Sequence, residues 1–339
     1  LSKELIRKFN LDEGREPQKF GIGIKELWEV DPKKHKKGLI QHSFGWPLKA
    51  NTGGGSFLYH FDDNLVSVGF VVHLNYKNPH LSPFEEFQRF KTHPSIRETF
   101  EGGKRISYGA RAITEGGFQS VPKLTFPGGA LIGCSAGFVN VPRIKGSHNA
   151  MATGMMAANA AFEAVKDGRQ ADVLSAYDET YDGSHVYQDL KRVRNVKPLW
   201  SKLGTIFGLP FAAVDMWMNQ LRIGLPITLK HGKPDHACTE PASKHKPIDY
   251  PKPDGKISFD RLSSVFLSAT NHEEDQPVHL RLTDDTVPIA HNLPVFDEPA
   301  QRYCPAGVYE VMREDDGSDP RFVINAQNCV HCKTCDIKD

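Results

Sequence analysis

Near its end the chain reads Cys329-Val-His-Cys332-Lys-Thr-Cys335, and Cys304-Pro305 comes some way before it. Three cysteines at overlapping C-x2-C spacing, together with a remote Cys-Pro, form the ligand pattern of a ferredoxin-type [4Fe–4S] site. Two short loops let three thiolates surround one corner of a cuboidal cluster. The fourth ligand, Cys304, must come from elsewhere in the fold.

A β-hairpin is predicted between the two groups of cysteines. Segments 308–313 and 321–325 have strand character, and the stretch 314–320 between them is rich in turn residues. Such a hairpin would bring Cys304 back beside Cys329.

Other uses of these cysteines are less consistent with the spacing. Zinc more often uses two separated C-x2-C pairs, but a structural zinc site stays open as an alternative. Disulfides are disfavoured because C-x2-C-x2-C holds its thiols too close for independent bridges. In two-cluster ferredoxins a further cysteine follows the run, whereas Asp339 stands four residues after Cys335. The pattern therefore predicts one cluster and a role in electron transfer.

Length and composition set broad limits on the protein class. With 339 residues and 39% hydrophobic content, the chain can form more than one packed domain. Its 42 basic and 41 acidic residues nearly cancel, so no general nucleic-acid role is indicated. Six cysteines, four of them in one ligand pattern, argue against a disulfide-stapled secreted protein. The first ten residues contain neither an initiator Met nor the apolar core of a signal peptide, so we expect a segment of a larger polypeptide.

The first third of the chain predicts a β-rich domain. Alternating residues in 20–30 and a hairpin pattern over 53–74 indicate strands, and 102–113 returns to strand character. Three glycines, Gly53 to Gly55, would let another group approach the backbone closely, although a bulge or tight turn explains them equally well. Phenylalanines spaced three apart in 83–91 predict a core-packed helix.

A strand, a small-residue turn and a helix follow in the middle of the chain. The strand is 130–133, the turn is Cys134-Ser-Ala-Gly-Phe138, and the helix runs from Gly146 to about Lys166 with Ser147 as a plausible N-cap. The helix N-terminus offers free N–H groups to an anion. This order is similar to the second flavin-contacting motif of FAD proteins with two-dinucleotide-binding-domain folds, which usually carry Asp where this chain has Cys134. An ordinary strand–loop–helix unit is the alternative.

Two later stretches are harder to interpret. Residues 198–229 are apolar and aromatic, but charges interrupt them, and Pro210 and Pro226 are expected to break any continuous helix. A segment lying in a membrane interface and a buried helical hairpin fit equally well. Residues 271–282 predict a loop and then a strand, and the His and Glu side chains in this loop are expected to be solvated rather than metal-binding.

With these features together, the chain resembles the electron transfer flavoprotein–ubiquinone oxidoreductase family over essentially its whole length. In that family Cys is the usual residue at position 134. The runs that carry the resemblance are Gly116-Gly-Phe-Gln-Ser120, Pro122-Lys-Leu-Thr-Phe-Pro-Gly-Gly129, Gly133-Cys-Ser-Ala-Gly-Phe138, Tyr250-Pro-Lys-Pro-Asp-Gly255, Cys304-Pro-Ala-Gly-Val-Tyr309 and 325–339.

The resemblance implies an α+β or α/β chain that is part of a two-dinucleotide-binding-domain FAD fold, with a β-rich quinone-binding domain and a small ferredoxin-like [4Fe–4S] domain. The expected division is 1–120 for ubiquinone, 121–197 for part of the FAD domain, 198–229 for a membrane-interface segment and 230–339 for the cluster domain.

The implied activity is that of an electron-transferring-flavoprotein dehydrogenase. Electrons from reduced electron transfer flavoprotein, which acyl-CoA dehydrogenases of fatty acid oxidation supply, would pass through the cluster and FAD to ubiquinone. The protein would lie monotopically on the matrix face of the mitochondrial inner membrane or on its bacterial counterpart. A soluble FAD/iron–sulfur reductase with another acceptor and a zinc-stabilised interaction module are the alternatives.

The resemblance also implies roles for individual residues. The four cysteines would be the cluster ligands, and the Tyr309 and Thr334 hydroxyls would lie beside the cluster, where a hydrogen bond to sulfur raises the potential. Gly54 and Gly55 would contact the quinone head. The implied FAD contacts are Gly133, Cys134, Ala136, Gly137, Phe138, Asn140, Gly146, Ser147 and His148. The family's N-terminal G-x-G-x-x-G segment is not in these 339 residues, so we expect weak FAD binding unless a further segment or companion chain supplies it.

Overall fold

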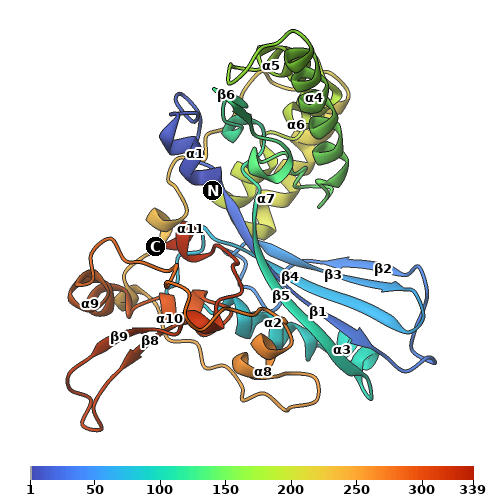
Figure 1. The fold of residues 1–339 in the computed structure, drawn as a ribbon. Coiled ribbons are helices and arrows are strands. Elements are labelled where there is room, and N and C mark those ends of the chain that lie inside the picture. Colours follow the sequence, from blue (N-terminus) through green and yellow to red (C-terminus); the bar gives the residue numbers. More distant parts are fainter. Residues whose placement is uncertain (1) are drawn as a thin grey trace. The chain divides into compact units, whose positions relative to one another are not determined.

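The computed structural model describes residues 2–339, which fold into two compact units (Figure 1). The first unit combines residues 2–21 with 113–237, and the second combines residues 22–112 with 238–339. The mixed α and β architecture predicted from the sequence is confirmed. These units are defined by contacts within the chain, and the expected functional boundaries at residues 120, 197 and 229 stay a prediction.

An antiparallel hairpin is the centre of the sheet in the second unit. The sheet has the strand order β2-β3-β4-β1-β5. Its strands are β1 (Phe20–Glu29), β2 (Ile40–Ser43), β3 (Gly54–Phe61), β4 (Leu65–His73) and β5 (Lys104–Thr114). The β3–β4 register pairs Gly54 with Val72 and Phe61 with Leu65, so the predicted hairpin is present. Asp62 and Asn64, in the connecting turn, both have positive φ, which Asp and Asn tolerate better than most residues.

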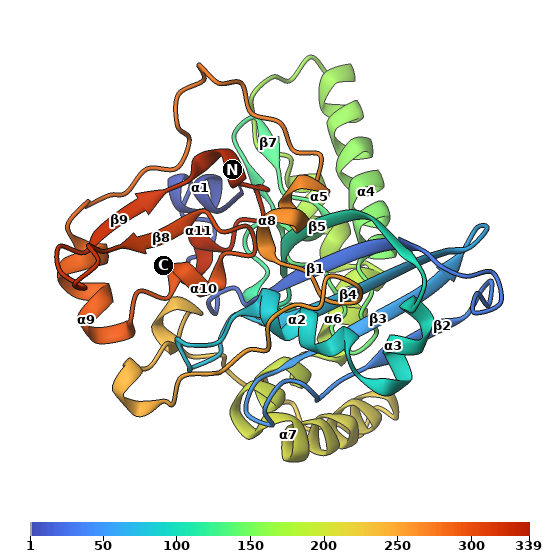
Figure 2. The same cartoon turned by 90° about the horizontal axis from the view of Figure 1, so that it is seen from below.

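Two helices cover one face of this sheet (Figures 1 and 2). They are α2 (Pro83–Lys91) and α3 (Pro94–Phe100). The Ser82 side chain caps α2 by accepting a hydrogen bond from the Glu85 N–H. The phenylalanines of α2 are buried as predicted, and the Phe90 ring stacks on Phe70 of β4 at 5.2 Å between centroids.

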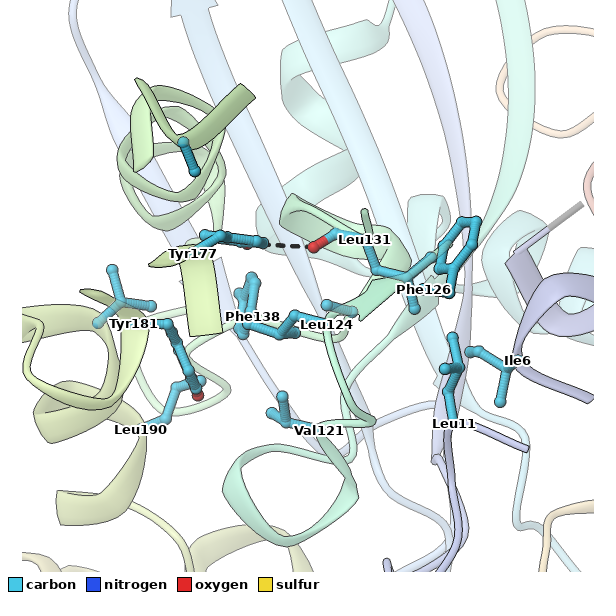
Figure 3. Packing of buried hydrophobic residues seen from close by; sticks show 13 residues of the cluster. Ile6, Leu11, Val121, Leu124, Phe126, Leu131, Phe138, Tyr177, Tyr181 and Leu190 are labelled. Carbon is cyan, nitrogen blue, oxygen red and sulfur yellow. Dashed lines mark hydrogen bonds between the residues drawn. The ribbon is translucent and has the colours of Figure 1, made fainter. Parts of the chain in front are cut away.

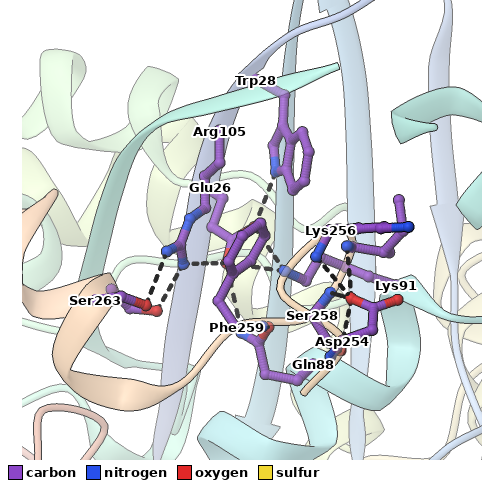
Figure 4. Close-up of polar contacts among 12 residues, drawn as sticks. Glu26, Trp28, Gln88, Lys91, Arg105, Asp254, Lys256, Ser258, Phe259 and Ser263 are labelled. Carbon is purple, nitrogen blue, oxygen red and sulfur yellow. Dashed lines mark hydrogen bonds and ion pairs between the residues drawn. The ribbon is translucent and has the colours of Figure 1, made fainter. Parts of the chain in front are cut away.

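A buried ionic network ties the same sheet to the loop that precedes the cysteine-rich region (Figure 4). Glu26 on β1 accepts hydrogen bonds from Lys91 Nζ at 2.8 and 3.0 Å and from Arg105 Nη1 at 3.3 Å. Arg105 also donates to Ser264 Oγ at 2.6 Å, and its guanidinium lies 3.9 Å from the centroid of the Phe259 ring. Arg105 therefore fixes the segment from Phe259 to Ser264 to the sheet.

The C-terminal part of the second unit contains short helices and one hairpin. Its elements are α8 (Arg261–Phe266), the π-helix η5 (Pro288–Asn292), α9 (Leu293–Phe296), α10 (Ala300–Tyr303), β8 (Tyr309–Met312), β9 (Arg321–Ile324) and α11 (Cys335–Lys338). Strands β8 and β9 pair antiparallel, with Tyr309 opposite Ile324, so the predicted hairpin is present. The strand predicted toward the end of 271–282 is wrong, because no strand is assigned in this segment and the β8–β9 sheet has only two strands.

The first unit is built from helices packed around a turn-rich segment. It contains α1 (Ser2–Lys8), β6 (Thr125–Phe126), β7 (Gly129–Ala130), α4 (Ser147–Lys166), α5 (Ser175–Asp182), α6 (His185–Arg192) and α7 (Val196–Gln220). Its core joins Ile6 and Leu11 to residues of the turn and of α5 and α6 (Figure 3). The buried Tyr177 hydroxyl donates to the Leu131 carbonyl at 3.1 Å and fixes α5 to the segment before the turn.

Three local predictions for this unit are wrong. The strand predicted at 130–133 is not formed: β7 ends at Ala130, and a 3-10 turn begins at Gly133. The N-cap of α4 is Gly146, and Ser147 is the first helical residue. Gly146 lies against Val139, where an added Cβ would be only 3.1 Å from the Val139 side chain, so a glycine takes the capping position. Pro210 does not break α7; the helix is interrupted instead at Gly204, whose φ is 70°. Pro210 lies inside the second helical segment, six residues after Gly204, and the chain stays helical there.

Candidate functional site

The four cysteines of the predicted metal pattern line one small cavity in the second unit. Besides Cys304, Cys329, Cys332 and Cys335, its walls are Leu280, Tyr303, Ala306, Val308, Tyr309, Val330, Lys333 and Thr334. Cys304 and Cys332 are buried, and Cys329 and Cys335 are partly exposed. The β8–β9 hairpin closes with a 2.7 Å hydrogen bond from Asn325 N–H to the Val308 carbonyl, which returns the chain to Cys304 as the sequence predicts.

Hydrogen-bond donors point at all four sulfurs. Cys304 accepts from the main-chain N–H groups of Ala306 and Val308. The Thr334 hydroxyl lies 3.3 Å from Cys332 Sγ, and the Tyr309 hydroxyl donates to Cys335. Donors of this kind stabilise negative charge on sulfur, so the cavity suits thiolates that bind a cationic centre.

Without a bound cation, burial works against the thiolate form. Burial, followed by the neighbouring Cys304, raises the pKa of Cys332 to about 12. Burial is also the main cause that raises the pKa values of Cys304, Cys329 and Cys335. Four thiols held together in this way favour a metal centre, which pairs its positive charge with the thiolates.

Strand β5 supports the cysteine loops from outside the cavity. The Ala112 N–H donates to the Cys332 carbonyl at 2.8 Å, and Arg111 Nη1 donates to the His331 carbonyl at 3.2 Å. The Tyr108 hydroxyl donates to the Pro305 carbonyl at 2.9 Å. One strand therefore positions both the C-x2-C-x2-C run and the Cys-Pro segment.

Three histidines gather beside Cys329. The rings of His272 and His279 stack with their centroids 5.6 Å apart, and the His331 ring lies 4.9 Å from that of His279. His279 Nε2 is 3.4 Å from Cys329 Sγ. His279, Cys329 and His331 offer ligand atoms within 4.8 Å of one another. The expectation of solvated side chains in 271–282 is wrong for His272, which is buried, whereas His279 is exposed although its Nε2 atom lies beside Cys329.

The flavin-type turn lies in the first unit and is held firmly by its own side chains. Gly133 has a φ of 53° and begins a short 3-10 turn, and its N–H donates to Thr153 Oγ1 of α4. Asn149 Nδ2 donates to the Phe138 carbonyl at 2.9 Å, and Asn140 Nδ2 donates to Asp189 at 2.7 Å. The side chains of these asparagines therefore fix the turn to the first turn of α4 and to α6.

The predicted FAD residues divide into a buried and an exposed group. Gly133, Ala136, Gly137, Phe138 and Asn140 are buried. Cys134, Ser147 and His148 are exposed, and Gly146 is intermediate. The buried residues shape the turn. The exposed residues lie on the surface, where a ligand or another protein segment can contact them.

The glycines predicted to contact quinone are also required by close packing within the chain. An added Cβ at Gly54 would be 2.2 Å from the Val71 carbonyl oxygen and 2.6 Å from Leu48 Cδ1. At Gly55 it would be 2.7 Å from the Ser43 carbonyl oxygen. Neighbouring strands thus explain both glycines without a ligand, and a quinone contact stays a prediction.

Helix α7 presents apolar side chains to the surface. Phe207, Phe211 and Trp217 are each more than half exposed, and so are Ile223, Leu225 and Ile227 in the segment after the helix. The alternative of a buried helical hairpin is wrong for this segment, because these side chains lie outside the core of the first unit. Within residues 2–339 no helix has the length and apolar character needed to cross a membrane.

Comparisons with known proteins agree with these features. The model of a family described as "ETF-QO, ubiquinone-binding" matches residues 20–113, and one described as "Electron transfer flavoprotein-ubiquinone oxidoreductase, 4Fe-4S" matches residues 255–339. The electron transfer flavoprotein-ubiquinone oxidoreductase of Pseudomonas aeruginosa is 58% identical over all of this chain and 61% of its own length. The human mitochondrial protein of the same name is 54% identical over all of this chain and 56% of its own length.

The chain belongs to the electron transfer flavoprotein–ubiquinone oxidoreductase family. It spans about three fifths of the length of these relatives. Among solved structures, a geranylgeranyl bacteriochlorophyll reductase-like protein of Thermoplasma acidophilum is 16% identical with a TM-score of 0.45 and covers 62% of this chain and 50% of its own. This last likeness carries no conclusion about function.

In this member of the oxidoreductase family, sequence reasoning anticipated the cysteines and the two hydroxyl residues but missed the supporting groups. No spacing rule connects Ala112 or Tyr108 of β5 with the cysteine loops more than 190 residues later. His279 belongs to a stretch rich in His and Glu, but it is 50 residues from Cys329 in sequence, so the contact between them could not be predicted. Its neighbour His331, inside the C-x2-C-x2-C run, was the only signal that histidines belong to this site.

Proposed function

We propose that this chain is part of an oxidoreductase that passes electrons from reduced electron transfer flavoprotein to ubiquinone at a membrane surface. The observation that carries the proposal is the cavity lined by all four predicted cysteines in a chain whose relatives bear that name. The four thiols and the donors around them fit a [4Fe–4S] cluster, with Cys304, Cys329, Cys332 and Cys335 as its ligands.

The bound groups would supply the redox chemistry: one-electron transfer at the cluster, and flavin chemistry at FAD that can pair single electrons for reduction of a quinone. The protein's own residues then have three tasks. The Tyr309 and Thr334 hydroxyls donate to cysteine sulfur and favour the reduced state. Apolar walls such as Val308 limit the access of water to the buried Cys304 and Cys332. Strand β5 holds the cysteine loops in place.

We also propose FAD contacts at the turn Gly133–Phe138, at Asn140 and at the start of α4, and quinone contacts at Gly54 and Gly55. The family match over residues 20–113 supports the quinone site. The exposed positions of Cys134 in the turn and of His148 at the start of α4 support the flavin site.

A further segment would complete the FAD site. Helix α4 has an apolar stripe on its exposed face, made by Met151, Met155, Ala158, Phe162 and Val165 at helical spacing. A groove lined by small residues of 128–130 and of α4 adjoins the stripe. A surface stripe of this kind marks an interface, and the part of the relatives' length outside this chain is the proposed occupant. Met155→Glu with Phe162→Glu should then prevent stable association with that part, while the matched surface change Glu163→Gln should not.

The membrane location is proposed from α7. The exposed aromatic and aliphatic side chains of 203–227 would lie in the interface of the mitochondrial inner membrane on its matrix side, or of a bacterial cytoplasmic membrane. A lipid-soluble quinone could then reach the protein without leaving the bilayer.

Metal analysis tests the central proposal. The purified chain should contain iron and acid-labile sulfide and should give an EPR signal on reduction. Cys304→Ser should lose most of the iron, whereas Cys238→Ser, outside the cavity, should keep it. Stoichiometric zinc without sulfide would overturn the proposal in favour of a zinc-stabilised module. A cluster in a protein that fails to bind lipid vesicles would favour a soluble reductase with another acceptor.

A further inference from the structure

The sulfur of Cys329 is approached by a side-chain donor that lies outside the cysteine motifs. Two cysteines of the C-x2-C-x2-C run have hydroxyl groups beside them: the Thr334 hydroxyl lies beside Cys332, and the Tyr309 hydroxyl donates to Cys335. Cys329 Sγ has the main-chain N–H of His331 at 3.4 Å and the Nε2 atom of His279, also at 3.4 Å. Each cysteine of the run is thus approached by one side-chain donor, and for Cys329 that donor is an imidazole.

The histidine ring is held in this position by its neighbours. His272 Nε2 lies 2.8 Å from the Cys329 carbonyl oxygen, and Gln276 Nε2 lies 3.3 Å from His272 Nδ1. A carbonyl accepts and an amide nitrogen donates, so His272 carries its proton on Nε2 and donates it to Cys329. The His272 ring lies nearly parallel to that of His279, at 11° between planes. His272 therefore contacts both the main chain of Cys329 and the His279 ring that faces the Cys329 sulfur.

The chemistry of the pair decides the direction of the bond. A cysteine sulfur bound to iron has no proton and can only accept, so the His279 Nε2 atom facing it must carry the hydrogen. A hydrogen bond to a cluster sulfur stabilises the reduced form, which has the greater negative charge, and raises the reduction potential. His279 does not need a positive charge for this role, because the neutral imidazole ring also has one N–H.

We propose that His279 is a further potential-setting residue of the cluster site, through a hydrogen bond from Nε2 to Cys329 Sγ, and that His272 is the positioning residue that holds it. This inference rests on the proposed function, since it requires the cluster to be bound by Cys329. It extends the set of donors to a segment, 271–282, that lies outside both cysteine motifs.

The test compares two variants of the full-length enzyme. His279→Phe keeps a stacked ring and removes the donor, whereas His279→Gln keeps an N–H donor near the place of Nε2. An EPR-monitored redox titration at one fixed pH should show a lower midpoint potential for His279→Phe. We expect a roughly tenfold loss in the equilibrium constant for reduction, which is about 59 mV for a one-electron couple. His279→Gln should recover most of this loss.

His331→Ala is the matched control. It removes a second imidazole ring of the three-histidine group but retains the main-chain N–H of residue 331, which donates to Cys329. Its midpoint potential should stay close to that of the unaltered enzyme. An unchanged potential in His279→Phe, with full iron content, would overturn the inference, and so would equal shifts in His279→Phe and His331→Ala.

A spectroscopic measurement on the unaltered residue covers the case in which His279→Phe fails to assemble the cluster. Histidine labelled with 15N only in the imidazole ring should give a nitrogen coupling to the reduced cluster in pulsed EPR, and the coupling should persist in His331→Ala. Its absence would overturn the inference. If the unaltered enzyme contains no iron, the proposed function fails as well, and metal analysis alone reveals that outcome.

Discussion

At the scale of single residues, His231 in the first unit shows how burial controls a titratable group. Its Nε2 atom lies 2.7 Å from the Gly116 carbonyl oxygen, and within residues 2–339 its buried Nδ1 atom has no hydrogen-bond partner. Burial, followed by the nearby cations Lys19 and Lys197, lowers the pKa of His231 to about 4, although the Gly116 hydrogen bond opposes this. The ring is therefore neutral in the folded protein at neutral pH.

This shift predicts a loss of stability in acid. The unfolded chain binds a proton at His231 near pH 6.5, whereas the folded chain binds it only near pH 4, so the contribution is complete above pH 6.5 and is lost as the pH falls toward 4. We expect about 3 kcal/mol to disappear over this range. Urea unfolding at several pH values should show this loss, and His231→Gln, which keeps a donor toward Gly116, should show less of it. Equal pH dependence in both proteins would contradict the assignment.

Gly54 allows a second prediction at this scale. A Cβ at this position would lie 2.2 Å from a main-chain oxygen of the paired strand, and that atom cannot move without breaking the sheet. Gly54→Ala should therefore destabilise the protein by about 1–3 kcal/mol, measured by thermal or urea unfolding. Gly109→Ala on β5, where the nearest atom is the end of Lys25 at 3.9 Å, is the control and should change stability little. A normal stability for Gly54→Ala would show that the β3–β4 pairing is looser than described.

At the scale of elements, the network around Glu26 joins β1, α2, β5 and the loop before α8 (Figure 4). Glu26 and Lys91 are fully buried, and burial lowers the pKa of Lys91 to about 8 although Glu26 raises it. Trp28 Nε1 donates to the same carboxylate at 2.8 Å. One carboxylate thus pairs with two buried cations and accepts a hydrogen bond from an indole N–H.

Removing that carboxylate should be costly. Glu26→Gln leaves Lys91 and Arg105 buried without their counter-ion, and we expect a loss of about 3–5 kcal/mol in the free energy of unfolding. The double variant Glu26→Gln with Lys91→Met should recover part of the loss. The control is Glu101→Gln, which breaks an exposed i,i+4 pair with Arg97 and should cost less than about 1 kcal/mol. Similar effects of Glu26→Gln and Glu101→Gln would show that the buried network does not hold these elements together.

At the scale of the whole molecule, the proposed membrane role depends on the exposed apolar side chains of α7. Changing Phe207, Phe211 and Trp217 to Ser removes exposed apolar area without altering the core of the first unit. The triple variant should lose binding to phospholipid vesicles in a flotation assay, while its iron content and EPR signal stay unchanged. Phe266→Ser, which removes an exposed aromatic ring elsewhere, is the control. Retained vesicle binding in the triple variant would contradict the interfacial role of α7.

The features that could be predicted from sequence are those with local causes. The turn-rich stretch 314–320 between two β-prone segments specifies the β8–β9 hairpin, and the hairpin brings Cys304 to the other cysteines. Helix α2 follows from the phenylalanine spacing. The position of the kink in α7 could not be read in the same way, because Gly204 and Pro210 both carry break signals and only the folded chain shows which one takes the non-helical φ.

By itself, the sequence predicted that Cys304 lies beside the other three cysteines and that a hairpin joins them, because short spacings and residue propensities act along the chain. Only the tertiary structure decided which groups surround the sulfurs. Tyr108 and Ala112 of β5 and the His272–His279 pair reach the cavity through contacts between segments far apart in sequence. Such contacts depend on how elements pack, a property that no residue spacing encodes.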